Sequence, residues 1–391
     1  MLKQILIDEL VPGMFVHAIA RQNTEVHAAI KKAGLVPNAE VIRLLRERGV
    51  LEVVIDTERS QFGPGAVSAE QAQTEREPPV KAPFAEEMAR AQVLYSEARS
   101  LQQKALNDLI SGKTVEIATF EQITGNFIDS VFRNHDALVC LTRIREKDAY
   151  LLEHSINVSI LMAVFCKHLR CERATMEEVC LGALMHDLGK VRIDEAVLHK
   201  PGKLTEDEFE LMKKHVLFSR DILTETSSKV PRRTMEVVMQ HHEKLDGHGY
   251  PFGLHADKIT RFGRMMSIVD IYDALTADRC YKRGMVPNAA LGILQSLAPH
   301  QLDGDLVLEF IRCMSIYPVG TLVKLESGKL GIVAETNPNE LTKPKVKVFY
   351  HTRYKRHIDV EYIDLASPRC SEKIASCEKP SAHNIDIAKY F

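Results

Sequence analysis

Several features that would assign this chain to a large class of proteins are missing from it. No apolar run is long enough to span a bilayer. The first ten residues contain acids where a signal peptide would be apolar, so we expect a cytoplasmic protein without membrane insertion. The formal net charge is only -2, and we therefore expect no overall field that recruits nucleic acid.

Disulfide frameworks and thiolate metal sites are also missing. The sequence has eight cysteines but no Cys-x-x-Cys pair, so we expect them to be reduced and mostly structural. Any metal site in this chain should then depend on histidine and carboxylate ligands.

Composition and periodicity predict a mainly α protein with several parts. Alternating apolar residues predict strands at both ends of the chain, and a stretch rich in Gly, Pro, Gln, Glu and Ala predicts a linker after the first part. The predicted segments are a small α/β regulatory domain (1–58), a flexible linker (59–83), a helical connector (84–146), the main helical domain (147–318), a small β-rich appendage (319–366) and a loosely structured tail (367–391).

The connector carries an apolar face whose partner the sequence leaves open. Leu94, Ala98, Leu101 and Leu106 could pack against the main domain or against another copy of the chain. A homodimer is one of these two alternatives.

The chemistry begins at the stretch from Leu181 to Lys190. Its leucines and methionine recur at the spacing of a buried helical face, which places His186 and Asp187 deep in a helix. A buried carboxylate needs a cation or hydrogen bonds, and the adjacent imidazole can bind the same metal ion. Lys190 lies about one helical turn further on, where it could meet an anion. A single His-Asp pair is nevertheless more often a structural pair of the core, in which the two side chains hydrogen-bond to each other or to another polar group.

Two further histidines lie on predicted buried faces. His154 shares the apolar side of the helix predicted over 151–169. His215 follows a helix start at which Thr205 and Glu208 have the spacing of a capping box. Each of them alone is more often a core histidine than a ligand.

Three more polar residues follow on later helices. His241 and His242 end a helical pattern, and successive helical side chains diverge by about 100°, so the pair could reach two neighbouring centres. Asp270 lies inside the apolar stretch 265–275. A solvated histidine pair and a structural aspartate are the alternatives.

Together, these five histidines and two aspartates fall on successive predicted helices of one domain, and this coincidence favours metal binding. Imidazole and carboxylate ligands suit iron, manganese or zinc better than magnesium or calcium. Seven ligands exceed the need of one tetrahedral ion, so we predict two ions bridged by Asp187, with a water between them as nucleophile.

The order of these residues resembles the HD-GYP domain, the branch of the HD metallohydrolases that cleaves the bacterial messenger cyclic di-GMP. The loop Leu245-Asp246-Gly247-His248-Gly249-Tyr250-Pro251 and the segment 273–279 complete the motif. The resemblance covers about residues 147–318 and implies an HD-type helical bundle. The N-terminal part is similar to a domain often found ahead of HD-GYP modules.

The resemblance also implies roles for individual residues. Lys190 matches a lysine that approaches the scissile phosphate, and Tyr250 lines the substrate cleft, where its ring could stack on guanine. Asp273, Arg279 and Lys282 match substrate-facing positions. The implied metal ligands, with Asp187 bridging and catalytic, are His154, His186, Asp187, His215, His241, His242 and Asp270.

Two positions depart from the family pattern. Some members have a glutamate for a third metal where this chain has Tyr150, and Glu153 points about 100° away from His154 on an ideal helix. We therefore predict two ions, iron or manganese, with zinc and nickel as further candidates. Cys280 stands where proline is common.

The expected function is a phosphodiesterase that opens cyclic di-GMP to pGpG, and a second cut to GMP is left open. Two alternatives remain: a cyclic di-GMP receptor with little or no turnover, and a hydrolase of another cyclic dinucleotide. Signalling proteins such as diguanylate cyclases are the expected partners.

Overall fold

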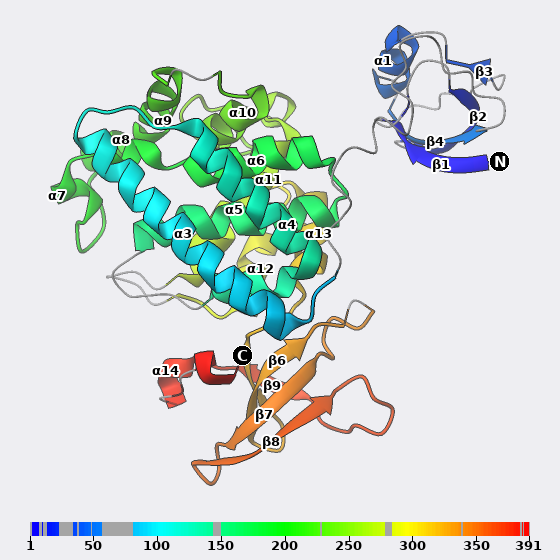
Figure 1. The fold of residues 1–391 in the computed structure, drawn as a ribbon, viewed down its shortest axis with the longest axis vertical. Coiled ribbons are helices and arrows are strands. Elements are labelled where there is room, and N and C mark those ends of the chain that lie inside the picture. The colour runs from blue at the N-terminus through cyan, green and yellow to red at the C-terminus, as the bar shows by residue number, and fades with distance from the viewer. Residues whose placement is uncertain are drawn as a thin grey trace. The chain divides into compact units, whose positions relative to one another are not determined.

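The computed structural model describes residues 2–7, 10, 14–22, 34–36, 39–47, 49–56, 81–143, 150–226, 229–277, 284–337, 339–383, 385 and 387–390. The chain divides into two compact units, Met1–Glu77 and Pro78–Phe391, which are described separately (Figure 1). Within the described parts of the chain, no helix is both long enough and apolar enough to cross a bilayer.

The first unit is a small antiparallel sheet with one helix. Its elements are β1 (Leu2–Leu6), β2 (Phe15–Gln22), β3 (Gly34–Leu35), α1 (Ala39–Glu47) and β4 (Val50–Asp56). The strand order is β1-β4-β2-β3. Ile5, Val16, Ile42 and Val53 form part of a separate apolar core, so this unit buries its own hydrophobic face.

Helices make up most of the second unit (Figure 1). They are α3 (Phe84–Ile110), α4 (Ile117–Leu141), α5 (Tyr150–His168), α6 (Arg173–Met185), η2 (Leu188–Arg192), α7 (Glu195–Leu198), α8 (Glu206–Lys213), α9 (His215–Thr224), α10 (Arg232–Gln240), η3 (Ala256–Lys258), α11 (Arg261–Thr276), α12 (Pro287–Leu297) and α13 (Gly304–Met314). Local signals explain several starts: Thr205 and Glu208 form the predicted capping box, and Pro287 is the first residue of α12.

Helix α5 runs through the centre of this bundle. It is buried from Glu153 to Cys166 and packs against α3, α4, α6, α11 and α13. A helix that is apolar on nearly all sides must be enclosed in this way, and a polar residue on it needs a partner inside the protein. His154 therefore lies at the centre of the domain.

The connector helix α3 packs against the main domain, which is the first of the two alternatives for its apolar face. Leu94 and Ala98 are buried in the core that also contains α5 and α6, and Leu101 and Leu106 pack against it. The long helix therefore belongs to the same hydrophobic core as the predicted metal ligands.

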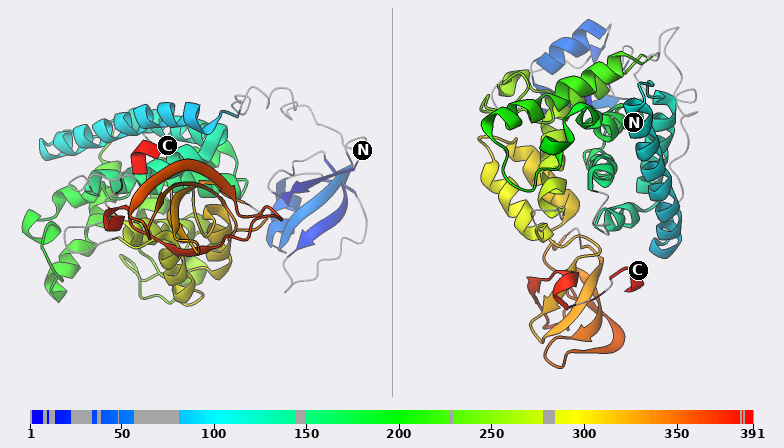
Figure 2. Two further views of the ribbon diagram at one scale, coloured as in Figure 1. Left: turned by 90° about the horizontal axis from the view of Figure 1, so that it is seen from below. Right: turned by 90° about the vertical axis from the view of Figure 1, so that its left-hand side faces the viewer.

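The second unit ends in an antiparallel sheet, drawn in orange in Figure 2. Its strand order is β8-β7-β6-β5-β9. Its strands are β5 (Leu322–Leu325), β6 (Lys329–Glu335), β7 (Lys345–His351), β8 (Arg356–Asp364) and β9 (Ile374–Cys377). Together with the helical bundle and the N-terminal sheet, this confirms the predicted fold class, mainly α with small strand-containing regions at both ends.

The sequence predicts a loosely structured tail over residues 367–391, and this is wrong for the part of the tail that the structure describes. Strand β9 pairs with β5, and short helices α14 (Pro380–His383) and η4 (Ile387–Tyr390) follow. The Tyr390 ring stacks on Phe349 with centroids 3.6 Å apart. The physical reason is that β5 offers a free edge and Phe349 an apolar face, which the tail covers.

Candidate metal centre

The predicted ligands come from five places in the bundle. His154 lies on α5, Asp270 on α11, and His215 is the first residue of α9. His186 and Asp187 lie between α6 and η2, and His241 and His242 directly follow α10. All seven side chains meet in one region, although more than a hundred positions separate the first from the last.

The sequence places His186 and Asp187 deep inside a helix, and this is wrong. Helix α6 ends at Met185, and Asp187 has φ −101° and ψ 6° before the chain enters η2. The reason is the close approach of α9: a Cβ on Gly189 would lie 2.1 Å from the His215 carbonyl oxygen. Only glycine permits this contact, which brings His215 next to Asp187.

Ser219 of α9 forms hydrogen bonds with the same turn. Its hydroxyl donates to the His186 carbonyl oxygen (2.7 Å) and accepts a hydrogen bond from the Gly189 amide (2.8 Å). Sequence reasoning missed Ser219, because a serine within an apolar helical pattern carries no signal of its distant partners. The predicted single helix from Thr205 to His215 is also two helices, α8 and α9, separated at Lys214.

Three histidines are oriented by backbone carbonyl groups of the preceding turn. His186, His215 and His241 direct Nδ1 at backbone carbonyl oxygens three residues earlier, those of Ala183, Met212 and Val238, each at 2.7 Å. A carbonyl oxygen can only accept, so Nδ1 carries the hydrogen in each ring. The other ring nitrogen, Nε2, is then a free ligand atom, as is usual for histidines that bind metals.

One group of candidate ligands combines histidine and carboxylate. Single ligand atoms of His154, His186 and Asp187 lie within 4.8 Å of one another. His154 Nε2 lies 2.9 Å from Asp270 Oδ1, and His186 Nε2 lies 3.3 Å from Asp187 Oδ2. His186 Nε2 and Asp187 Oδ1 are buried and make no hydrogen bond within the described structure. Buried polar atoms without such partners fit a site for a cation.

A second group consists of His215, His241 and His242, whose ligand atoms also lie within 4.8 Å of one another. His215 Nε2 and His241 Nε2 are only 3.3 Å apart. Since both rings carry their hydrogen on Nδ1, two lone pairs face each other across this distance. A cation between them would turn this repulsion into binding, so the residues present fit a metal ion.

Asp187 lies between the two groups. Its Oδ2 is the atom nearest His186, and its Oδ1 lies 3.3 Å from His215 Nε2. Lys190 Nζ lies 2.5 Å from Asp187 Oδ2, and its side chain is partly exposed. One oxygen of Asp187 therefore faces each group, which allows Asp187 to contribute a ligand atom to both.

Burial and charge change the pKa of His154 in the first group in the opposite direction from those of His215 and His242 in the second. Burial lowers the pKa of His215 to about 4 and that of His242 to about 3. Burial also opposes protonation of His154, but hydrogen bonds to Asp270 and Asp273 raise its pKa to about 9. Burial would raise the pKa of Asp187, whereas His186 and Lys190 hold it well below its usual range.

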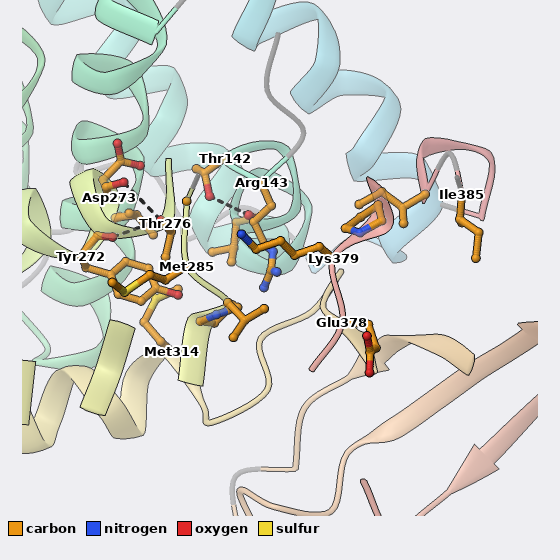
Figure 3. A pocket seen from close by; sticks show the side chains of 17 residues that line it. Thr142, Arg143, Tyr272, Asp273, Thr276, Met285, Met314, Glu378, Lys379 and Ile385 are labelled. Carbon is orange, nitrogen blue, oxygen red and sulfur yellow. Dashed lines mark hydrogen bonds between the residues drawn. The ribbon is translucent and has the colours of Figure 1, made fainter. Parts of the chain in front are cut away.

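The family resemblance implies a substrate-facing position for Asp273, but in the structure its carboxylate contacts His154 Nδ1. Asp273 Oδ2 is 2.7 Å from His154 Nδ1, and the side chain is buried. It also borders a separate cavity of about 340 Å³ between α11 and the C-terminal segment that carries Glu378 and Lys379 (Figure 3). The reason is helical geometry: Asp273 lies one turn after Asp270 and faces the same histidine.

Tyr250 packs beside the second group. Its ring centroid lies 4.6 Å from that of His242. The loop that carries Tyr250 is held by Glu243, a buried residue that sequence reasoning missed: its carboxylate accepts hydrogen bonds from the amides of Phe252 and Leu254, both at 2.8 Å. Gly247 has φ +77°, which explains a glycine at that point of the loop.

Some predicted site residues lie outside the part of the chain that the structure describes. Arg279, Cys280 and Lys282 are outside the described residues, as is the side chain of Tyr150. Glu153 is buried, and its Oε1 lies 3.8 Å from Arg99 of α3.

Comparison with known proteins gives matches along the whole chain. An HD domain model matches residues 139–306, and a model for a domain of unknown function (DUF3391) matches residues 2–120. A cyclic di-GMP phosphodiesterase of Pseudomonas aeruginosa is 33% identical over 391 residues, which cover 98% of this chain and 94% of the relative.

Two further matches are more limited. A 3'3'-cGAMP-specific phosphodiesterase of Vibrio cholerae is 32% identical over 173 residues, 44% of this chain and 37% of that protein. A solved structure of an HDG"Y"P protein from Bdellovibrio bacteriovorus is 14% identical and covers 79% of this chain and 98% of that chain, with a TM-score of 0.47.

Proposed function

Since this chain belongs to the HD-GYP family of HD-domain proteins, we propose that it is a metal-dependent phosphodiesterase that hydrolyses cyclic di-GMP. The observation that carries the metal-dependent part is the pair of imidazole Nε2 atoms, His215 and His241, that lie 3.3 Å apart while Nδ1 of each ring lies 2.7 Å from a backbone carbonyl oxygen. The substrate is supported by the relative that matches nearly the whole chain and is named for that activity.

Two divalent ions, iron or manganese with zinc and nickel as further candidates, would supply an acidified water as nucleophile and positive charge at the phosphate. One ion would be held by the group of His154, His186 and Asp187, and the other by the group of His215, His241 and His242. Asp270, whose two oxygens face His154 and His242, and Asp187 would join the groups. Two ions rather than three are proposed because Tyr150 replaces a carboxylate.

The remaining side chains would bind and orient the substrate. Lys190 can move its cation from Asp187 to a phosphate oxygen, where it would stabilise charge that develops in the transition state. Tyr250 offers a ring face for a base. Arg279 and Lys282 are proposed substrate contacts from the family resemblance alone. The products would be pGpG and then GMP, and a link to diguanylate cyclases follows from the shared nucleotide.

A second substrate is supported by one observation, the similarity of this chain to a 3'3'-cGAMP-specific phosphodiesterase. That nucleotide also contains a guanine and two phosphodiester bonds, so the same phosphate chemistry would serve. The two substrates differ in one base only, and rates measured side by side distinguish them.

The test is to purify the protein without oxygen, measure metal per chain, and assay hydrolysis of both nucleotides. We expect about two ions per chain and formation of pGpG. Asp187→Ala should lose turnover and metal because Asp187 contacts both ligand groups. The matched control is Asp257→Ala, an exposed aspartate on η3, which should keep both.

Two results would contradict the proposal. Tight cyclic di-GMP binding without any pGpG would favour a receptor. Full turnover by Asp187→Ala would remove the proposed role of the metal centre.

A further inference from the structure

A second cavity opens beside the metal centre, on the side of the connector helix. It has a volume of about 200 Å³ and is bordered by Asp187 and Lys190 at the metal centre. One wall is α3, with Leu106 and Ile110, and the other is the segment from η2 to α7. Helix α3 lies outside the HD domain match at 139–306 and within the DUF3391 match at 2–120.

The position of α3 at this cavity is fixed by buried polar contacts. Gln102, which is buried, donates from Nε2 to the Leu184 carbonyl oxygen at 2.7 Å, two residues before His186. Tyr95 donates to Asn157 Oδ1 at 2.8 Å on α5. These contacts hold α3, which forms one wall, against the helices that carry the candidate ligands. The shape of the cavity is therefore fixed by the packing of the domain.

The size and lining of the cavity suit one base of a dinucleotide. Complete ligands usually occupy about 300–1,000 Å³, so a cavity of about 200 Å³ takes part of one. Leu106, Ile110, Val191 and Leu198 line the cavity, with Ile110 largely exposed, and apolar side chains of this kind pack against the flat faces of a base. Lys190, which also lines the cavity, would meet the phosphate that is joined to that base through its sugar.

Glu195, an exposed residue and the first of α7, lines this cavity. A carboxylate has two acceptor oxygens and no hydrogen to donate. The Watson–Crick edge of guanine carries two neighbouring donors, N1–H and the N2 amino group, which match these oxygens. Adenine has an acceptor at N1 and no amino group at C2, so the same carboxylate would repel it.

We propose that this cavity binds one guanine of the substrate and that Glu195 selects guanine over adenine. This inference rests on the proposed function for the identity of the ligand. It adds a base-recognition site formed by the connector helix α3 and by α7, at residues with no assigned role.

The experiment measures binding and turnover separately on metal-loaded full-length protein. Binding of cyclic di-GMP and cyclic di-AMP is followed by calorimetry with their phosphorothioate analogues, which resist hydrolysis, and turnover is followed with the natural nucleotides. We expect the wild type to prefer the guanine nucleotide. Glu195→Gln should lower the affinity for it about tenfold or more, because charge-assisted hydrogen bonds are lost, while cyclic di-AMP binding stays weak and unchanged.

Two further variants complete the design. Leu106→Trp should fill the cavity and weaken binding of the guanine nucleotide, and a thermal melt shows whether that variant is folded. Glu206→Gln, an exposed first-turn glutamate of α8 that does not line the cavity, should leave the preference unchanged.

The outcomes separate the two proposals. An unchanged preference in Glu195→Gln, or no preference in the wild type, overturns the base site even where pGpG forms normally. Selective, Glu195-dependent binding without pGpG supports the base site and overturns the hydrolase proposal.

Discussion

Two sides of the metal centre orient their histidines in different ways. On the side of α6, α9 and α10, His186, His215 and His241 are oriented by carbonyl oxygens of the preceding turn. On the side of α5, His154 is oriented by Asp273 of α11, 119 positions away in the sequence. The first arrangement is local in sequence, and the second exists only when two distant helices have packed.

The two sides also differ in charge. His154 lies between the carboxylates of Asp270 and Asp273, and this raises its pKa to about 9. The imidazoles of His215 and His241 instead face each other as neutral rings. The α5 side therefore balances the charge of His154 with its own carboxylates, whereas the group of His215, His241 and His242 consists of imidazoles alone. Mutations that act on one side only should reveal this difference.

The largest effect should come from Gly189→Ala, on the side where carbonyl oxygens of the preceding turn orient the histidines. The new Cβ would lie 2.1 Å from the His215 carbonyl oxygen and 2.4 Å from the Ser219 amide nitrogen, both backbone atoms that cannot turn away. We expect a loss of about 3 kcal/mol or more in the free energy of unfolding, together with loss of bound metal. Chemical denaturation and metal analysis measure the two effects.

Gly292→Ala is the matched control. A Cβ at Gly292, inside α12, meets nothing within 4 Å, so the change should stabilise the helix by up to about 1 kcal/mol. Equal stability of the two alanine variants would show that the approach of α9 to the turn is not as close as described.

A smaller effect is expected from Asp273→Ala, on the α5 side of the metal centre. The backbone stays, but His154 loses the carboxylate that fixes its ring, and partners of this kind usually change metal affinity about 10–100-fold. Asp273→Asn retains an acceptor for His154 Nδ1–H and should recover part of the affinity. Titration with manganese measures it. If Asp273→Asn were as weak as Asp273→Ala, charge rather than ring orientation would explain the role of Asp273.

The same contrast explains how much of the centre the sequence could predict. The helical periodicity placed His154 and Asp270 on buried faces, and the capping box at Thr205 and Glu208 is confirmed. These signals depend on neighbours within one or two turns. The structure brings the seven predicted side chains together, while their roles as ligands stay predictions.

Distant contacts could not be predicted in this way. The turn at Asp187 depends on how closely α9 approaches Gly189, and the position of Asp273 depends on the packing of α11 against α5. The tail after residue 367 is ordered by β5 and Phe349, which lie earlier in the chain. In each case the local sequence carries no record of the partner that decides the structure.

The smallest effect is expected from Ser219→Ala, which removes the hydrogen bonds of the turn without adding an atom. The Gly189 amide and the His186 carbonyl would each lose a partner, and we expect a loss of about 1–3 kcal/mol in the free energy of unfolding. Metal content should stay near that of the wild type, because His186 Nδ1 keeps its own carbonyl partner. If Ser219→Ala lost metal as completely as Gly189→Ala, the turn would depend on the serine rather than on the close packing of α9, and the local side would be no more robust than the side that Asp273 holds from a distance.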